Sequence, residues 1–312
     1  MNRLLILAED AAHYAALVKQ ADLPRLEISV ACDTASATAL LADCNVVLGE
    51  PPLVGETLAS MEHLEWVQST WAGVDSLCRS GLRRDYTLTG AKGVFGKLIS
   101  EYVMTYLFAF ERQIFTLRDN QSMKRWKPLR YRPAREITLG IAGLGSIGRE
   151  LARSARHFGI RVTGVSRSGR PCDDVQRVYG VDGLAEFLAE PDYIVLTLPD
   201  TTETKGLIDA RALELMKPSS VLINVGRGSI VNEADLVDAL SEGGIAGAVL
   251  DVFENEPLDR ESPLWRMPNV YITPHIAATS FPQDIVAIFV DNYLRFIDSR
   301  PLLHRIDFEL GY

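Results

Sequence analysis

The feature of this sequence that most constrains its fold is a glycine-rich turn between an apolar run and a helical pattern. Residues 136–148 read Glu-Ile-Thr-Leu-Gly-Ile-Ala-Gly-Leu-Gly-Ser-Ile-Gly, and Gly143, Gly145 and Gly148 have G-x-G-x-x-G spacing. The first glycine suits a tight turn, the second lets the backbone approach a pyrophosphate, and the third lets a helix pack on a strand. Because an apolar strand precedes the glycines and a helical pattern follows at residues 149–158, the turn predicts a dinucleotide site.

Short apolar runs alternate with longer helical patterns on both sides of this turn, as in parallel βα units. In the first third of the chain, strands are expected at residues 3–8, 26–31, 45–48, 64–68 and 86–89. From residue 137 the rhythm restarts, with strands expected at residues 137–142, 161–165, 193–198, 221–225, 247–250 and 270–272, and a helix capped by Asn232.

A chain of 312 residues exceeds the usual size of one hydrophobic core. A final amphipathic helix at residues 283–298 is long enough to return to the first domain. We therefore predict an α/β protein of two doubly wound parallel-sheet domains. A Rossmann dinucleotide-binding domain, residues 98–285, is inserted in a flavodoxin-like substrate domain made of residues 1–97 and 286–312.

Two segments between the predicted sheets differ sharply in composition. Residues 97–115 predict a long apolar helix rich in aromatic side chains, whereas residues 119–135 carry six arginine or lysine residues, two prolines and Trp126, with little apolar periodicity. We predict that residues 119–135 form an irregular arm on the surface.

Charge and cysteine usage exclude several classes of protein. The net charge of −9 argues against nucleic acid or an anionic membrane as a partner, because either would need a basic face. The four cysteines show no C-x-x-C spacing, so a metal site and a disulfide framework are both unsupported.

The apolar run near the N-terminus is too short for a signal peptide, and no window approaches a membrane span of about 18 apolar residues. We expect a cytoplasmic protein.

The end of the strand after the glycine turn bears on which dinucleotide binds. Residues 165–170 read Val-Ser-Arg-Ser-Gly-Arg, and no acidic residue follows until Asp173. An NAD site usually places Asp or Glu about 20 residues beyond the glycines, whereas arginines and hydroxyl groups suit the 2′-phosphate of NADP. The alternative is a solvated basic loop. The position favours NADP over NAD, with NAD still possible, and predicts a phosphate site at Ser166, Arg167, Ser168 and Arg170.

Three further strand ends carry polar residues, in the segments 224–228, 250–257 and 273–278. Ligands of an open parallel sheet lie beyond the carboxyl ends of its strands, so Arg227, Glu256 and His275 are expected to converge.

The chemistry of these three residues is complementary. Hydride transfer to a ketone creates an alkoxide, which a histidine can protonate near neutral pH. A carboxylate orients the imidazole and stabilises its protonated form, and an arginine can clamp a substrate carboxylate. Taken singly, His275 could be structural, Arg227 a surface ion-pair partner and Glu256 a loop carboxylate. The three matched roles beside a nucleotide site favour the catalytic interpretation.

At these residues the sequence resembles the D-isomer-specific 2-hydroxyacid dehydrogenases. The resemblance covers nearly the whole chain and includes Ser-Thr-Trp-Ala-Gly-Val-Asp at residues 69–75 and Leu-Pro-Asp-Thr-Thr-Glu-Thr-Lys-Gly at residues 198–206. Within the family it is most similar to the NADPH-preferring glyoxylate/hydroxypyruvate reductases. That closer similarity lies at residues 101–102, 126–128, 166–168, 261–265 and the terminal Gly311-Tyr312.

The resemblance implies roles for individual residues. Arg227 binds the substrate carboxylate and ketone, Glu256 pairs with His275, and His275 supplies the proton. The backbone amides of Ala72 and Gly73 hold the substrate carboxylate, and Asp251 bonds the nicotinamide amide. The remaining cofactor-binding residues are expected to be Gly143, Gly145, Ser146, Ile147, Gly148, Leu198, Pro199, Thr204, Val225, Gly226 and Ala277.

The resemblance also implies a homodimer in which the arm bearing Trp126 docks on a second subunit and reaches its active site. Trp71 departs from the family pattern, since many members have a small residue there. Its indole either narrows the substrate pocket toward short acids such as glyoxylate or packs as core.

Two other functions remain open from the sequence. Dinucleotide-sensing corepressors share this scaffold, and the fold alone does not exclude them. The intact Arg–Glu–His set argues against a sensor, which needs no proton donor. A dehydrogenase for another acid, such as another 2-hydroxy acid, formate or phosphite, is the second alternative, and because such relatives also carry Arg227 and His275, the motif does not rank them.

Overall fold

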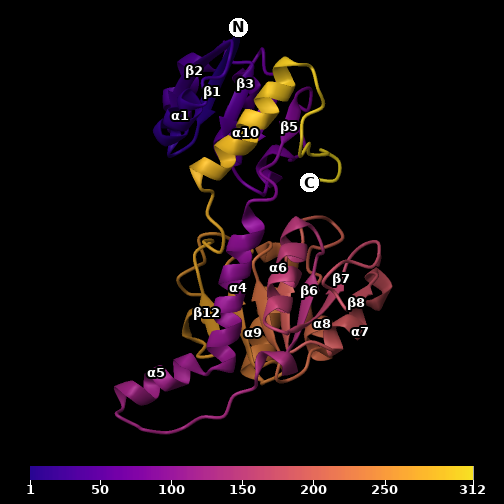
Figure 1. Ribbon diagram of the computed structural model, residues 1–312. Helices are drawn as coiled ribbons and strands as arrows, with labels where there is room; N and C mark the ends of the chain where they lie inside the picture. The colour runs from indigo at the N-terminus through magenta and orange to yellow at the C-terminus, as the bar shows by residue number, and fades with distance from the viewer. Residues whose placement is uncertain (312) are drawn as a thin grey trace. The chain divides into compact units, whose positions relative to one another are not determined.

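The computed structural model in Figure 1 describes residues 1–311, so Tyr312 of the terminal Gly311-Tyr312 match lies outside the described residues. The chain divides into two compact units, here called unit 1 (Met1–Val94 with Ser280–Tyr312) and unit 2 (Phe95–Thr279). These limits keep helices α4 (Phe95–Glu111) and α10 (Pro282–Ile297) whole. The boundaries expected from sequence, after residues 97 and 285, differ from them by cutting both helices near their starts.

Unit 1 is built on a five-stranded sheet in the order β2-β1-β3-β4-β5, with every neighbouring pair parallel. This is the flavodoxin-like order expected for the substrate domain. Its strands are β1 (Asn2–Leu7), β2 (Leu26–Ala31), β3 (Val46–Gly49), β4 (Trp66–Ser69) and β5 (Thr87–Thr89). Its helices are α1 (Ala11–Gln20), α2 (Thr34–Ala37), α3 (Pro51–Thr57) and α10.

Helix α10 belongs to this core although it comes from the far end of the chain. The ring of Phe289 stacks on the buried indole of Trp66, with 5.2 Å between centroids. The hydroxyl of Tyr293 donates to the carbonyl of Pro24 at 2.9 Å. The C-terminal helix therefore packs in unit 1, as its length predicted.

Unit 2 is built on a seven-stranded sheet in the order β12-β11-β10-β9-β6-β7-β8, again with all pairs parallel. Read from the β8 edge and numbered from β6, the six strands from β8 to β11 reproduce the 3-2-1-4-5-6 order of a Rossmann domain, and β12 adds a seventh strand. The strands are β6 (Thr138–Ala142), β7 (Arg161–Val165), β8 (Arg177–Tyr179), β9 (Tyr193–Leu196), β10 (Val221–Asn224), β11 (Gly247–Leu250) and β12 (Val270–Ile272). The sequence did not predict β8, a three-residue strand at the sheet edge.

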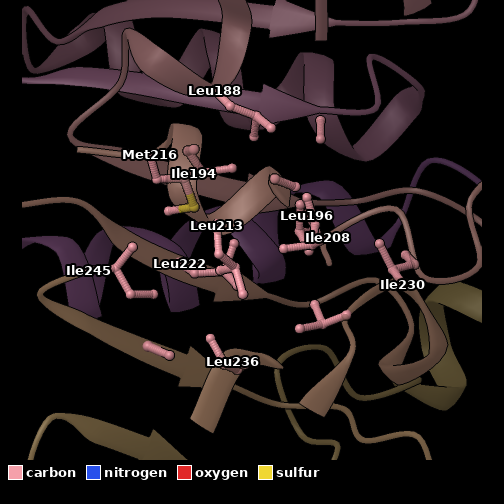
Figure 2. Close-up of a cluster of buried hydrophobic side chains, with 14 of the residues drawn as sticks. Leu188, Ile194, Leu196, Ile208, Leu213, Met216, Leu222, Ile230, Leu236 and Ile245 are labelled. Carbon is pink, nitrogen blue, oxygen red and sulfur yellow. The ribbon is translucent and has the colours of Figure 1, made fainter. Parts of the chain in front are cut away.

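Both faces of the unit 2 sheet are covered, which explains why its strands read as continuous apolar runs. Along β9, Ile194 and Leu196 face the cluster drawn in Figure 2, whereas Tyr193 and Val195 face a second cluster on the other side. The covering helices are α4, α6 (Ser146–His157), α7 (Leu184–Ala189), α8 (Ala210–Leu215) and α9 (Glu233–Ser241). The predicted cap is confirmed, since Asn232 Oδ1 accepts from the N–H groups of Ala234 and Asp235.

The segment after α4 departs from the expectation in one respect. Helix α4 ends at Glu111, Gln113 takes a left-handed φ of 53°, and a second helix, α5, runs over Ile114–Ser122. The predicted irregular arm, residues 119–135, is therefore helical over its first four residues, where the carbonyl of Asp119 accepts from Met123 N–H and Ser122 Oγ. Figure 1 shows α5 and the chain after it projecting from the rest of unit 2.

An ion-pair network anchors the returning end of this arm. The guanidinium of Arg132 contacts Glu111 at 2.5 Å and Asp192 at 3.3 Å, and both carboxylates are nearly buried. The hydroxyl of Tyr193 also donates to Glu111 at 2.9 Å. The tip is different, since the side chain of Trp126 is 98% exposed.

No helix among residues 1–311 is long and apolar enough to span a membrane. Within the same residues, no cluster of three or more histidine, cysteine, aspartate or glutamate side chains has an arrangement suited to a metal ion.

Candidate active site

The glycine turn is shaped by contacts that leave no room for side chains. Gly143 has a φ of 104°, and a Cβ atom on it would lie 3.0 Å from the carbonyl oxygen of Thr197. A Cβ atom on Gly148 would lie 2.0 Å from the carbonyl oxygen of Gly143, so helix α6 packs directly on the turn. A Cβ atom on Gly145 would meet nothing within 4 Å, and no side chain caps α6 there. The turn thus has the close packing, the open side and the helix N-terminus that suit a dinucleotide.

The loop at residues 166–170 follows β7 and is open to solvent. The N–H group of Gly169 donates to the carbonyl of Ser166 at 3.2 Å, which closes a tight turn. The side chains of Arg167, Ser168 and Arg170 are exposed. Arg167 Nη2 lies 3.0 Å from Glu203 Oε2, and these side chains are 56% and 70% exposed. Glu203 was not among the predicted site residues, because nothing in the sequence links positions 36 residues apart.

Arg227 stands on a loop that the end of β10 holds in shape. The buried side chain of Asn224 accepts from the N–H group of Gly226 at 3.1 Å and donates to the carbonyl of Arg227 at 2.9 Å. The guanidinium of Arg227 donates to the carbonyl of Gly226 at 2.8 Å. The next residue joins this loop to the one after β11, since a Cβ atom on Gly228 would lie 1.8 Å from the backbone carbon of Phe253.

The loop after β11 presents Glu256 to His275. One carboxylate oxygen, Oε1, accepts from the N–H group of Phe253 at 3.0 Å, and the other, Oε2, lies 2.8 Å from His275 Nδ1. His275 itself has a φ of 54°, and its N–H group donates to the carbonyl of Asp251 at 2.9 Å. The imidazole is 54% exposed and Glu256 is 37% exposed, so the pair is open on one side.

Asp251 is buried, and both of its carboxylate oxygens bond to the loop that bears His275. Oδ1 accepts from Thr273 Oγ1 at 2.5 Å and from the N–H group of Ile276 at 2.8 Å, while Oδ2 accepts from the N–H group of Ala277 at 2.9 Å. The hydroxyl of Tyr102, on α4, lies 2.6 Å from Thr273 Oγ1. The sequence predicts that Asp251 bonds the nicotinamide amide. It did not suggest that Asp251 also holds the loop of His275.

Charge and hydrogen bonding shift the pKa values of His275 and Glu256 in opposite directions. The bond from Glu256 raises the pKa of His275. Burial lowers it, the charges of Glu256 and Asp251 raise it, and Arg227 lowers it, with a net rise. Burial alone would raise the pKa of Glu256, but the hydrogen bonds from His275 and from Phe253 N–H, with the nearby positive charges, bring it below its ordinary value. The pair therefore favours an imidazolium beside a carboxylate.

The other predicted cofactor residues lie on neighbouring loops of the same sheet. Thr204 Oγ1 donates to the carbonyl of Pro199 at 2.7 Å and accepts from the N–H group of Thr201. A Cβ atom on Gly226 would lie 3.0 Å from the carbonyl oxygen of Leu198, so these two loops are in backbone contact. Ala277 is buried, whereas Val225 is partly exposed.

In unit 1, the predicted carboxylate-binding segment follows β4. Ser69 Oγ accepts from the N–H group of Trp71 and donates to its carbonyl, which fixes the turn. Among the described residues, the N–H groups of Ala72 and Gly73 donate no hydrogen bond. The indole of Trp71 is 40% exposed, which excludes the interpretation of Trp71 as a core side chain.

A hollow of about 620 Å³ in unit 1 lies at the opposite ends of the strands. Asn2 and Thr87, which begin β1 and β5, line it together with Arg25, Arg300 and Arg305. Because ligands of open parallel sheets bind beyond the carboxyl ends, and because this hollow contains none of the predicted residues, it is not the candidate active site.

A Rossmann unit whose strand ends carry the glycine turn, Arg227 and the Glu256–His275 pair defines a dinucleotide-dependent oxidoreductase. Comparison with known proteins narrows this class. The sequence profile of the D-isomer specific 2-hydroxyacid dehydrogenase NAD binding domain matches residues 104–277, more than half of the chain. Glyoxylate/hydroxypyruvate reductase A of Serratia proteamaculans is 34% identical over 266 residues, which cover 82% of this chain and 84% of that protein.

Solved structures agree over nearly the whole chain. A D-isomer specific 2-hydroxyacid dehydrogenase family protein from Aeromonas salmonicida has a TM-score of 0.94 at 46% identity, covering 98% of this chain and 99% of its own. The NADPH-dependent glyoxylate/hydroxypyruvate reductase of Sinorhizobium meliloti, solved with NADP and sulfate, has a TM-score of 0.90 at 30% identity and full coverage of both chains. The chain belongs to the D-isomer specific 2-hydroxyacid dehydrogenase family and is an NAD(P)-dependent oxidoreductase.

Proposed function

We propose that this protein reduces a small 2-keto acid, such as glyoxylate or hydroxypyruvate, to the 2-hydroxy acid with NADPH. The observation that carries the proposal is the 2.8 Å contact between His275 Nδ1 and Glu256 Oε2, on a loop in backbone contact with the loop of Arg227. The names of the Serratia and Sinorhizobium reductases support the substrate class.

His275 is the proposed proton donor. Its Nδ1 atom faces Glu256, which leaves Nε2 as the atom that can give a proton to the ketone oxygen. The raised pKa of His275 extends to higher pH the range over which the ring is protonated, and the protonated ring is the form that a reduction requires. Glu256 orients the ring and stabilises its charge without itself taking the proton.

Arg227 is proposed to bind the substrate carboxylate through a bidentate contact and to polarise the ketone oxygen. The N–H groups of Ala72 and Gly73, which donate to no described residue, are proposed to bind the same carboxylate. Trp71, with its exposed indole, is proposed to narrow the space for the substrate side chain and so favour short acids.

The reduced nicotinamide, when bound, supplies the hydride. The glycine turn with Ser146 and Ile147 would hold its pyrophosphate, and residues 166–170 would hold the 2′-phosphate. The absence of an acid on β7 and the exposed Arg167 support NADPH as the preferred form, as do the NADP and NADPH complexes of the structural relatives. The remaining contacts are proposed for Leu198, Pro199, Thr204, Val225, Gly226, Asp251 and Ala277.

The decisive test measures turnover of glyoxylate, hydroxypyruvate, pyruvate and phenylpyruvate with each reduced cofactor, followed by nicotinamide absorbance. His275→Ala should leave NADPH binding nearly intact and lower kcat by about 10²–10⁴, the usual effect of removing a positioned general acid. No turnover of any keto acid by the unmodified protein would refute the proposed reaction. A His275→Ala variant that keeps most of its activity would refute the proton donor alone.

We also propose that the arm mediates a two-fold homodimer and places Trp126 near the substrate pocket of the partner. Trp126 is 98% exposed, and α5 and the arm also expose Ile114, Leu117, Met123 and Tyr131. Aromatic and apolar side chains are costly to leave in water and are enriched at interface centres. Sedimentation tests the proposal: a monomer that is fully active at assay concentration would contradict it.

A further inference from the structure

The hydrogen bonds behind His275 reach a residue that the proposed mechanism does not use. Three hydrogen bonds run from Tyr102 on α4, through Thr273 and Asp251, to the backbone next to His275. All four residues belong to unit 2.

The number of hydrogens on each group determines which group donates in each of these hydrogen bonds. A threonine hydroxyl has one hydrogen, and an ionised carboxylate only accepts. Asp251 accepts from the N–H groups of Ile276 and Ala277, so it behaves as a carboxylate, and the hydrogen of Thr273 goes to its Oδ1 atom. The hydroxyl of Tyr102 must therefore be the donor to Thr273 Oγ1, at 2.6 Å. Burial raises the pKa of Tyr102, so the phenol keeps the proton that this bond needs.

Tyr102, at which this series of hydrogen bonds begins, is held rigidly on helix α4. The ring of Tyr102 packs against that of Tyr106, with 4.9 Å between centroids. Helix α4 lies so close to α6 that a Cβ atom on Gly96 would be 2.7 Å from Glu150 Cβ. A hydroxyl on such a helix is a fixed point, whereas Pro274, His275 and Ile276 of the loop are exposed.

The loop needs a fixed point because its conformation is unfavourable. His275 has a φ of 54°, in the left-handed region that non-glycine residues seldom occupy. Three donors from this loop converge on the single carboxylate of Asp251, and His275 N–H bonds to the carbonyl of the same residue. Asp251 thus holds the loop on both sides of His275, and Thr273 is the point at which Tyr102 can orient it.

We propose that Tyr102 is a positioning residue for the reaction, which fixes the loop of His275 against Glu256 through Thr273 and Asp251. This rests on the proposed function only in assigning the proton transfer to His275. Tyr102 touches neither substrate nor cofactor in this scheme. Its contribution is to keep the imidazole in the arrangement that Glu256 can bond.

A double-mutant cycle on kcat tests the chain of bonds. Tyr102→Phe should lower kcat about 3- to 10-fold, the value of one hydrogen bond, with the Michaelis constants nearly unchanged. Thr273→Val should lower it more, because it leaves buried Asp251 short of a donor, and Thr273→Ser should restore most of the loss. Tyr102→Phe should have no further effect in the Thr273→Val background. Additive effects would overturn the proposal, because residues that act through one another are not additive.

A second readout does not depend on turnover. The chain has five histidines, so the His275 ring can be followed by NMR in the cofactor-free protein and assigned with His275→Ala. The charges facing this ring are those of Glu256, Asp251 and Arg227, and the bond with Glu256 is the main cause of its raised pKa. In Thr273→Val, and less so in Tyr102→Phe, the pKa of His275 should fall as that bond loosens.

A pKa of His275 that stays unchanged or rises in both variants would overturn positioning, since the ring would still be held against Glu256. If no keto acid is turned over but the pKa falls as expected, the proposed function fails and the positioning stands. Tyr86→Phe and Thr163→Val are matched controls, because each removes a buried hydroxyl that has no hydrogen-bond partner among the described residues. Neither control should move the pKa of His275 or kcat.

Discussion

The turns that follow β6 and β7 stand at neighbouring strand ends of one sheet and are built in opposite ways. After β6, the turn is held by contact between backbones, since a Cβ atom on Gly148 would lie 2.0 Å from the carbonyl oxygen of Gly143. After β7, the loop points Arg167 into solvent, where it pairs with Glu203 at 3.0 Å while remaining 56% exposed. Close backbone packing therefore characterises the turn after β6, and exposed charged side chains characterise the loop after β7.

This difference matches what each turn is proposed to recognise. The pyrophosphate is common to NAD and NADP, so backbone N–H groups that bind it do not distinguish the two cofactors. The 2′-phosphate distinguishes the two cofactors, and exposed charged side chains recognise it. A side chain added at a packed glycine of the first turn should therefore damage the fold together with binding, whereas changes in the second turn should alter cofactor preference and leave the fold intact.

The largest effect is expected for Gly148→Ala. Alanine would gain about 1 kcal/mol of helix propensity, but its Cβ atom would strike backbone that has no rotamer to change. We expect the free energy of unfolding to fall by about 3 kcal/mol, the upper end for overpacking, with loss of nucleotide binding. Denaturant unfolding and titration with 5′-ADP measure the two effects.

Gly145→Ala is the matched control for this variant. A Cβ atom on Gly145 meets nothing within 4 Å, and its backbone φ of −74° suits alanine. Its stability should stay near that of the unmodified protein while 5′-ADP binds more weakly, because the methyl group would lie where a phosphate approaches. Equal stability of the two variants would contradict the steric account of the first turn.

The next largest effect is expected for Arg167→Asp. Charge-assisted contacts with a phosphate contribute about 1.5–3 kcal/mol, so 2′,5′-ADP should bind roughly 10- to 150-fold more weakly while 5′-ADP binds as before. Calorimetry with both ligands measures this, and the Michaelis constants for NADPH and NADH should converge or invert. Equal constants for the two cofactors in the unmodified protein would refute the proposed preference for NADPH.

The sequence alone predicted the fold and most of its elements, and the reasons are physical. A parallel sheet covered on both faces needs continuous apolar runs such as Tyr193–Leu196, which stand out against helical periodicity. The strand β8 was missed because three residues at a sheet edge carry no such run. The helical start of the arm was missed because α5 has little apolar periodicity and begins at the left-handed Gln113.

For the site, the residues proposed to have a chemical role lie at strand ends and could be predicted from the sequence, whereas those proposed to act through other residues could not. Arg227, Glu256 and His275 each follow a strand, and the contact between Glu256 and His275 was expected from their chemistry. Tyr102 is 171 residues from Thr273, and no local pattern reports a bond across that distance. Glu203 was missed for the same reason.

Charge also predicts how the proposed reaction depends on pH, through the pair of Glu256 and His275. In the unmodified protein, reduction should be fast below the raised pKa of His275 and should slow as the pH rises through it. Glu256→Gln removes the main cause of the raised pKa of His275, so the alkaline limb of the pH profile of kcat should move to lower pH. The maximal rate should fall roughly tenfold or less, because glutamine still accepts a hydrogen bond. Glu254→Gln, an exposed acid of the same loop, is the control and should leave the limb in place.

The smallest effect is expected for Glu203→Gln, which tests whether charge alone governs the second turn. Glu203 competes with a 2′-phosphate for Arg167, but exposed pairs contribute only about 0.2–1 kcal/mol. We expect 2′,5′-ADP to bind about two- to fivefold more tightly, 5′-ADP to bind as before, and the gain to shrink as salt rises. Glu214→Gln, on α8, removes the same charge from an exposed site and should leave both affinities unchanged. Weaker binding of 2′,5′-ADP to Glu203→Gln would show that Glu203 orients Arg167 for the phosphate instead of competing with it.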